Sequence, residues 1–214
     1  MRSKAGTFFM VLGTVLIPAA LSLLLWNKKE ATEAEKASME ILPKIVEAIE
    51  ERIGDSKVKA GEAEEKTGEQ IEELSDPFDT EMTVVEIDGY SYIGFLSIPS
   101  LNLELPVMAE WDYKRLKIAP CRYSGSVKSD DLVIAGHNYA RHFSPIKWMK
   151  AGEQVQFTDM DGRVWEYQVG WLENLKPEAV ERMIESGENH AWDLTLFTCT
   201  TGGAARCAVR CIRK

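Results

Sequence analysis

Cys199 is the residue of this sequence whose position best suits nucleophilic chemistry. It ends the strand-like run "TLFTC" at residues 195 to 199, and Arg206 follows it across a turn of small residues. A thiol attacks as its thiolate, so it needs a base or a nearby cation. His137 is the candidate base, since it directly follows the apolar run "LVIAG" and is held there by a rigid strand. Together these three residues suit acyl transfer, whereas a lone cysteine or histidine is more often structural.

The other cysteines favour neither a metal site nor a disulfide. The chain has no C-x-x-C pair, and apart from His137 and His142 its histidines lack the spacing of zinc ligands. Cys207 and Cys211 lie four residues apart in an expected strand, about 13 Å between Cα atoms, which is beyond the ~7 Å that a disulfide spans. We therefore expect no metal and no cofactor, with Cys207 and Cys211 as small core residues.

Strand alternation distinguishes the two arginines that follow Cys199. It places Arg206 and Arg210 on the face opposite Cys207 and Cys211, about 13 Å apart at ~3.3 Å per residue. Only Arg206, next to the turn, is then expected to reach an oxyanion formed at Cys199. Arg210 is left to solvent, to a surface carboxylate or to a groove wall.

The elements that must position these residues begin at Met82. From there to Lys214 about eight short β-rich runs are separated by Asp-Gly, Pro, Ser-Gly and Gly-Gly turns. That spacing favours a closed barrel or a sandwich. A helical insertion is expected at 176–186, and "SPIKWM" suggests a second short helix.

The N-terminus carries a candidate membrane anchor, residues 1–29. Ala5 to Trp26 form 22 residues without a charge, flanked by basic residues on both sides. At about 1.5 Å per helical residue this run spans the ~30 Å hydrocarbon layer. A cleaved signal peptide is the alternative, but its apolar region is usually only ~7–15 residues long and ends in an A-x-A site, which is missing here. The flanking charges do not fix the orientation.

Residues 30–81 read as an acidic, partly helical stalk. Glu30 to Glu81 contain 17 acidic and 6 basic residues. Ile41, Ile45, Ile49 and Ile53 recur at i+4 spacing before Gly54, which predicts a short amphipathic helix that Gly54 ends. The polar stretch after it is typical of a solvated spacer. No basic patch with interleaved aromatic residues suggests a nucleic-acid partner.

Residues 82–214 resemble the sortases, membrane-anchored cysteine transpeptidases of Gram-positive bacteria. The resemblance rests on "TLFTC" with Arg206 downstream, on "AGHN" upstream, and on "IGFLSIPSLNLELPV" at the start of the β-rich region. It implies a closed eight-stranded sortase-type β-barrel, with Cys199 as nucleophile, His137 as acid and base, and Arg206 as oxyanion partner. It also implies cleavage of an LPxTG-like sorting signal after Thr, and transfer to an amine of a cell-wall precursor or a pilin lysine.

The class of sortase is left open by mixed features. "GHN" resembles class B, whereas Asp76 and Phe78 of "DPF" resemble the lid of class C; the alternative for residues 76–78 is a turn that joins stalk to barrel. Candidate substrate contacts are Asn138, Thr198 and Thr200.

Two other functions are alternatives to the sortase interpretation. A papain-like cysteine peptidase would share the Cys/His pair and favour water as acceptor. A non-catalytic membrane-tethered β-domain that binds a surface partner would need neither residue. If the sortase reading holds, residues 30–214 are extracellular on a single-pass anchor, because cell-wall acceptors lie outside.

Overall fold

The computed structural model describes residues 4–64, 81–185 and 191–214, so the candidate lid at 76–78 lies outside the described residues. The helices and strands follow in the order α1 (Lys4–Glu64), β1 (Val85–Ile87), β2 (Tyr90–Ile98), η1 (Pro99–Leu101), β3 (Leu103–Met108), η2 (Arg115–Lys117), β4 (Cys121–Ser124), β5 (Leu132–Gly136), η3 (Ser144–Trp148), β6 (Gln154–Asp159), β7 (Val164–Leu175), α2 (Glu181–Ile184), β8 (Leu194–Cys199) and β9 (Arg206–Arg213).

Eight strands close into a barrel. They are hydrogen-bonded in the order β2-β3-β4-β5-β8-β9-β7-β6, and β6 pairs back with β2 to complete the ring. β1 extends the sheet outside the ring as a hairpin with β2, through a turn at Asp88 and Gly89 whose φ angles of 51° and 78° suit a tight hairpin. The expected closed eight-stranded barrel is therefore confirmed, and the sandwich alternative is wrong.

Alternate residues of the strands fill the barrel. Val209 and Cys211 of β9 lie in the interior core with Leu194 and Leu196 of β8. Cys207 is buried as well. Both cysteines are thus the small core residues that strand alternation predicts.

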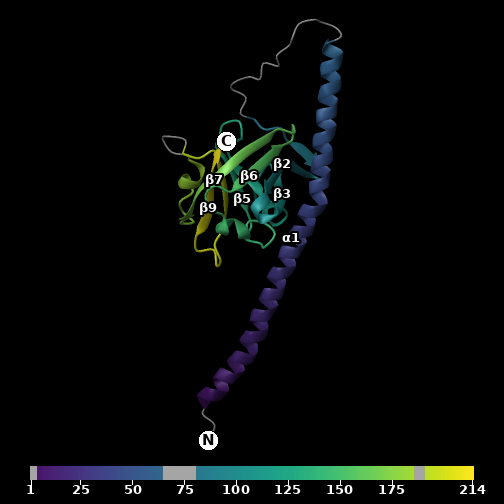
Figure 1. Ribbon diagram of the computed structural model, residues 1–214. Helices are drawn as coiled ribbons and strands as arrows, with labels where there is room; N and C mark the ends of the chain where they lie inside the picture. The colour runs from purple at the N-terminus through teal and green to yellow at the C-terminus, as the bar shows by residue number, and fades with distance from the viewer. Residues whose placement is uncertain (1–3, 65–80, 186–190) are drawn as a thin grey trace.

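The candidate anchor and the stalk form one continuous helix, α1, which runs along one side of the barrel and beyond it (Figure 1). Its N-terminal part is long and apolar enough to cross a membrane by length and composition, and none of its most apolar window is buried among the described residues. Large side chains such as Phe8, Leu24 and Trp26 are exposed there.

The C-terminal half of α1 packs on the barrel through the isoleucines that recur at i+4 spacing. Ile41, Ile45 and Ile49 are buried in a cluster with barrel residues that include Tyr92 and Met108. This confirms the amphipathic helix. The stalk is consequently part of the folded domain along this stretch.

α1 does not end at Gly54, as the sequence predicts, but continues to Glu64. A Cβ on Gly162 would lie 2.4 Å from Cδ1 of Ile53, so the absence of a side chain at Gly162 lets this turn of α1 approach the barrel closely. Contacts of this kind outweigh the ~1 kcal/mol by which a single glycine disfavours helix.

The two short helices are present in reduced form. Of the insertion expected at 176–186, the part that the structure describes, 176–185, forms only the single turn α2, Glu181–Ile184. Its Met183 is buried against the outer face of the barrel, in a cluster with Phe197 and Trp192. "SPIKWM" forms the 3-10 helix η3, Ser144–Trp148.

Candidate active site

Strand register brings His137 and Cys199 to one edge of the barrel. β5 and β8 are parallel neighbours in which Gly136 pairs with Thr198. His137 follows Gly136 and Cys199 follows Thr198, so both leave the paired strands at the same edge. Side chains alternate in step along parallel neighbours, which points the imidazole and the thiol to the same face.

Arg206 joins the same edge from the other side of β8. Cys199 pairs directly with Arg206 in the antiparallel β8–β9 ladder, and paired residues share a face of the sheet. The three residues that sequence analysis singled out are thus brought together on three neighbouring strands. Their catalytic roles remain predictions.

The turn between Cys199 and Arg206 is ordered by Thr200. The backbone N–H of Thr200 donates to the carbonyl of Ala205 at 2.9 Å, and its Oγ1 accepts from the Ala205 N–H at 3.0 Å. Gly202 and Gly203 have φ angles of 82° and 75°, which their missing side chains permit. Thr200, a candidate substrate contact, therefore holds the turn that sets the spacing between thiol and guanidinium.

Arg206 is folded back over this turn. Its Nη1 donates to the carbonyls of Gly203 at 3.1 Å and Ala205 at 3.2 Å. A guanidinium carries five N–H donors, so the contacts of one nitrogen leave donors for a further acceptor.

Arg210 is not left to solvent, as strand alternation suggested, but is almost completely buried. It donates to Glu173 at 2.9 Å and to Thr195 Oγ1 at 2.7 Å, and its guanidinium lies 4.8 Å from the centre of the Trp192 ring. A carboxylate was one of the expected partners of Arg210, and Glu173 is that partner, but it belongs to a buried network and not to the open surface. Arg210 thereby fastens the β7–β8 connection to the barrel.

The other two candidate substrate contacts are partly or wholly enclosed. Thr198 pairs with Cys207, on the face of β8 opposite Cys199. Thr198 Oγ1 and Asn138 Oδ1 are buried without a hydrogen-bond partner among the described residues. Their contact with substrate remains a prediction. A substrate would have to reach Thr198 from the inner face of the barrel.

His137 is partly buried and held by its own loop. Its ring stacks on that of Tyr139, with centroids 4.6 Å apart and planes 19° apart. Burial lowers the pKa of His137 and the positive charge of Lys117 lowers it further, while the negative charge of Glu30 raises it. The neutral imidazole, which can accept a proton, is favoured.

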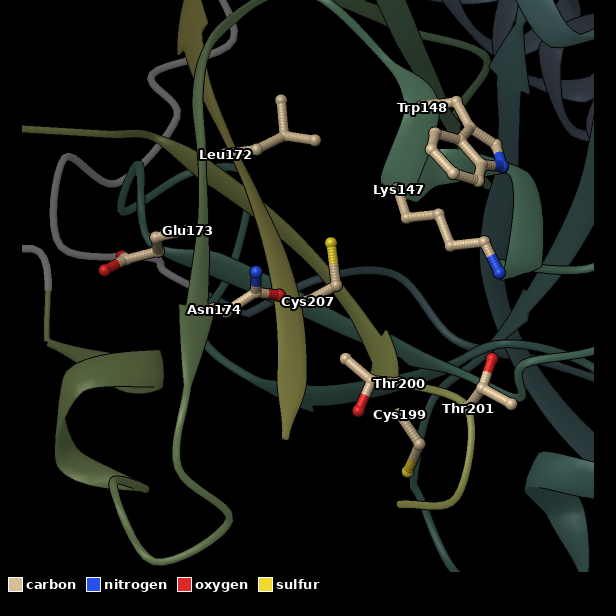
Figure 2. Close-up of a pocket in the computed structure, with 9 residues that line it drawn as sticks. All are labelled: Lys147, Trp148, Leu172, Glu173, Asn174, Cys199, Thr200, Thr201 and Cys207. Carbon is tan, nitrogen blue, oxygen red and sulfur yellow. The ribbon is translucent and has the colours of Figure 1, made fainter. Parts of the chain in front are cut away.

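A pocket of about 540 Å³ adjoins Cys199 (Figure 2). It is lined by Lys147, Trp148, Leu172, Glu173, Asn174, Cys199, Thr200, Thr201 and Cys207. Figure 2 shows the sulfur of Cys207 directed toward the middle of this group and the sulfur of Cys199 directed away from it. The pocket therefore adjoins Cys199 without being the space into which its thiol points.

An aromatic strip lies on the face to which the thiol points. Phe197, two residues before Cys199, contacts Tyr123 at 5.2 Å between ring centroids, and Tyr123 contacts Trp111 at 5.2 Å. This strip has no signal in the sequence, because its rings come from separate strands and loops. Only Phe197 stood within a recognised motif.

Comparison with known proteins gives one consistent family. A family model described as a sortase domain matches residues 96–213. Sortase A of Bacillus anthracis is 28% identical over 133 residues, 60% of this chain and 61% of the relative, so the match spans about three fifths of that relative's length.

Solved structures support the same fold. Sortase C1 of Streptococcus agalactiae has a TM-score of 0.57 at 22% identity, covering 83% of this chain and 97% of that one. Sortase C of Streptococcus pneumoniae has a TM-score of 0.54 at 24% identity, covering 82% and 96%. Sortase A of Corynebacterium diphtheriae has a TM-score of 0.51 at 18% identity, covering 90% and 95%.

Proposed function

The chain belongs to the sortase family, and from that premise we propose that it is a cysteine transpeptidase in which Cys199 is the nucleophile, His137 the acid and base, and Arg206 the oxyanion donor. The strand register supports this assignment most directly, because it brings the three side chains to one edge and one face of the barrel.

The first half-reaction forms an acyl-enzyme. The neutral imidazole of His137 takes the proton of the Cys199 thiol, and the resulting thiolate attacks the carbonyl carbon of the threonine in an LPxTG-like sorting signal. Arg206 donates to the oxyanion of the tetrahedral intermediate. The imidazolium of His137 then protonates the departing amine, and the peptide bond breaks to leave a thioester on Cys199.

The second half-reaction transfers the acyl group. An acceptor amine attacks the thioester, the now neutral imidazole of His137 takes its proton, and Cys199 departs as a thiolate. We propose a cell-wall precursor or a pilin lysine as the source of the amine. Among the similar structures, that of sortase C from Streptococcus pneumoniae is described as giving insight into the pilin substrate specificity of that protein.

The apolar part of the sorting signal needs an apolar surface on the thiol side of the barrel. The aromatic strip offers one through the more exposed rings of Tyr123 and Trp111, which pack on the buried Phe197. We propose that it receives the Leu-Pro portion, whose burial against aromatic rings stabilises the complex.

The membrane location rests on α1, and the side on which the barrel lies rests on the proposed function. We propose that the N-terminal part of α1 is a single-pass anchor, since this part is apolar and exposed. The barrel then lies on the extracellular side, where surface proteins meet cell-wall acceptors.

Mass spectrometry of the reaction products tests the proposed function. The purified full chain in detergent is incubated with an LPxTG peptide and triglycine, and we expect a product cleaved after Thr and joined to the added amine. Cys199→Ala should abolish it, whereas Cys207→Ala, which removes a buried thiol nearby, should retain it. Hydrolysis without transfer would favour a peptidase, and turnover by folded Cys199→Ala would contradict the assignment.

A further inference from the structure

The loop that carries His137 is packed against α1. Lys117 Nζ donates to Glu30 Oε1 of α1 at 2.9 Å, and the hydroxyl of Tyr139 donates to Glu30 Oε2 at 3.3 Å. One carboxylate of the helix thus binds both the loop after β5 and the 3-10 helix η2.

A second set of contacts lies one to two helical turns further along α1. Arg141 Nε donates to Glu35 Oε1 at 3.0 Å. Ser38 Oγ donates to the carbonyl of Ile118 at 3.1 Å and lies 3.3 Å from His142 Nε2. Because that donation uses the only hydroxyl proton of Ser38, its oxygen accepts from Nε2–H of His142. Residues 30–38 therefore clamp the loop at both ends.

Tyr139 links this clamp to the catalytic ring. Its side chain is only 7% exposed, and one face of its ring stacks on His137 at 4.6 Å. Its hydroxyl is fixed by Glu30. The ring of His137 therefore rests on a surface whose position is set by α1.

We propose that Tyr139, Glu30 and Lys117 are positioning residues for the imidazole of His137, which makes residues 30–38 of α1 part of the catalytic apparatus. This inference rests on the proposed function only for the role of His137. The contacts themselves make a separate prediction about its charge.

The groups that face His137 come from each element at this edge. They are Glu30 of α1, Lys117 of η2, Tyr139 and His142 of the same loop, Cys199 of β8 and Arg206 of β9.

Glu30 and Lys117 act on the charge of the ring in opposite directions. Glu30→Gln removes the carboxylate and leaves Lys117 without its neutralising partner, so the pKa of His137 should fall further. Lys117→Gln removes the cation and leaves the carboxylate, so that pKa should rise.

Titration of the histidine ring resonances by NMR tests this on the full chain in detergent micelles. The chain has three histidines, so His137→Gln identifies the resonance of His137. We expect Glu30→Gln and Lys117→Gln to shift its titration in opposite directions. Glu33→Gln, which removes an exposed charge of α1 paired with Lys29, should not shift it. Shifts in the same direction, or none, would overturn the proposal.

Kinetics of Tyr139 variants separate stacking from anchoring. Tyr139→Phe keeps the stacked ring and loses the bond to Glu30, while Tyr139→Leu loses both. With folding checked by circular dichroism, we expect kcat to fall on the order of 10-fold to 10²-fold in Tyr139→Leu with KM little changed, and less in Tyr139→Phe. Equal kcat in wild type and Tyr139→Leu would overturn the positioning role.

The titration also distinguishes the two proposals. If wild type shows no transpeptidation while the two shifts are observed, the proposed function fails and the cluster stands. If transpeptidation depends on His137 and the shifts are missing, the proposed function stands and the positioning role of Glu30 and Lys117 fails.

Discussion

Arg206 and Arg210 project from the same face of β9 but lie in different surroundings. Arg206 is partly exposed at the turn beside Cys199, whereas Arg210 is enclosed by Glu173, Thr195 and Trp192. Strand alternation predicts their common face. It cannot predict that the β7–β8 connection folds over one of them, because that depends on contacts distant in sequence.

Arg206→Ala should lower the transpeptidation rate on the order of 10²-fold or more, because it removes the donor to the oxyanion. Arg206→Lys should recover only part of the loss, since lysine keeps the charge without the planar fork. Steady-state kinetics of both variants measure this. Full activity in folded Arg206→Ala would contradict the oxyanion role.

Arg210→Ala should destabilise the fold by about 3 kcal/mol, because it removes the buried guanidinium that donates to Glu173, to Thr195 Oγ1 and to the carbonyls of the β7–β8 connection. The control is Arg182→Ala, which removes an exposed partner of the same Glu173 and should cost at most about 1 kcal/mol. Denaturant unfolding compares the two. Similar losses would mean that the buried network contributes little.

At the scale of elements, the packing of α1 on the loop after β5 was not predictable. The i+4 isoleucines predict an apolar face, and the structure confirms it through Ile41, Ile45 and Ile49. The polar contacts of Glu30, Glu35 and Ser38 carry no such period. In an acidic stretch they resemble any solvated glutamate or serine.

His142 should make this interface sensitive to acid. It is fully buried, and burial lowers its pKa from 6.5 to about 4. The unfolded chain therefore binds a proton between pH 6.5 and 4 that the folded chain excludes. The contribution of His142 to the free energy of unfolding is fully present above pH 6.5. It decreases as the pH drops through this window, by about 2 kcal/mol at pH 5.

Unfolding of the wild type and of His142→Gln at pH 7.5 and pH 5 measures this contribution. The variant should be less stable at pH 7.5 but should lose less on acidification than the wild type. An equal loss in both proteins would assign the acid sensitivity to other groups.

At the scale of the whole molecule, the barrel should be exposed on intact cells. A protease added outside should release fragments of residues 82–214 while the apolar part of α1 stays in the membrane. Cells that express the chain and are treated before lysis, followed by peptide mass spectrometry, test this. Fragments that appear only after lysis would place the barrel on the inner side.

The strand order of the barrel follows the motifs only in part. "LVIAG" and "TLFTC" predict two strands that end in functional residues, and the structure places them side by side as β5 and β8. That they are parallel neighbours, and that β6 closes onto β2, comes from long-range pairing. Resemblance to a family supplied this arrangement where residue patterns could not.

Because α1 is one continuous helix, it limits how far the barrel can move from the apolar N-terminal part. Trp26 ends the uncharged run, and Glu30, which binds the loop of His137, follows after about 6 Å of helical rise. A flexible linker of about fifty residues would place the domain some 40 Å from its anchor on average. If the apolar part of α1 lies in a bilayer, the barrel edge that carries Cys199 instead stays within a thin layer at the membrane surface. A sorting signal or acceptor that is itself held in that membrane meets the thiol at a high effective concentration, whereas one in free solution gains no such advantage.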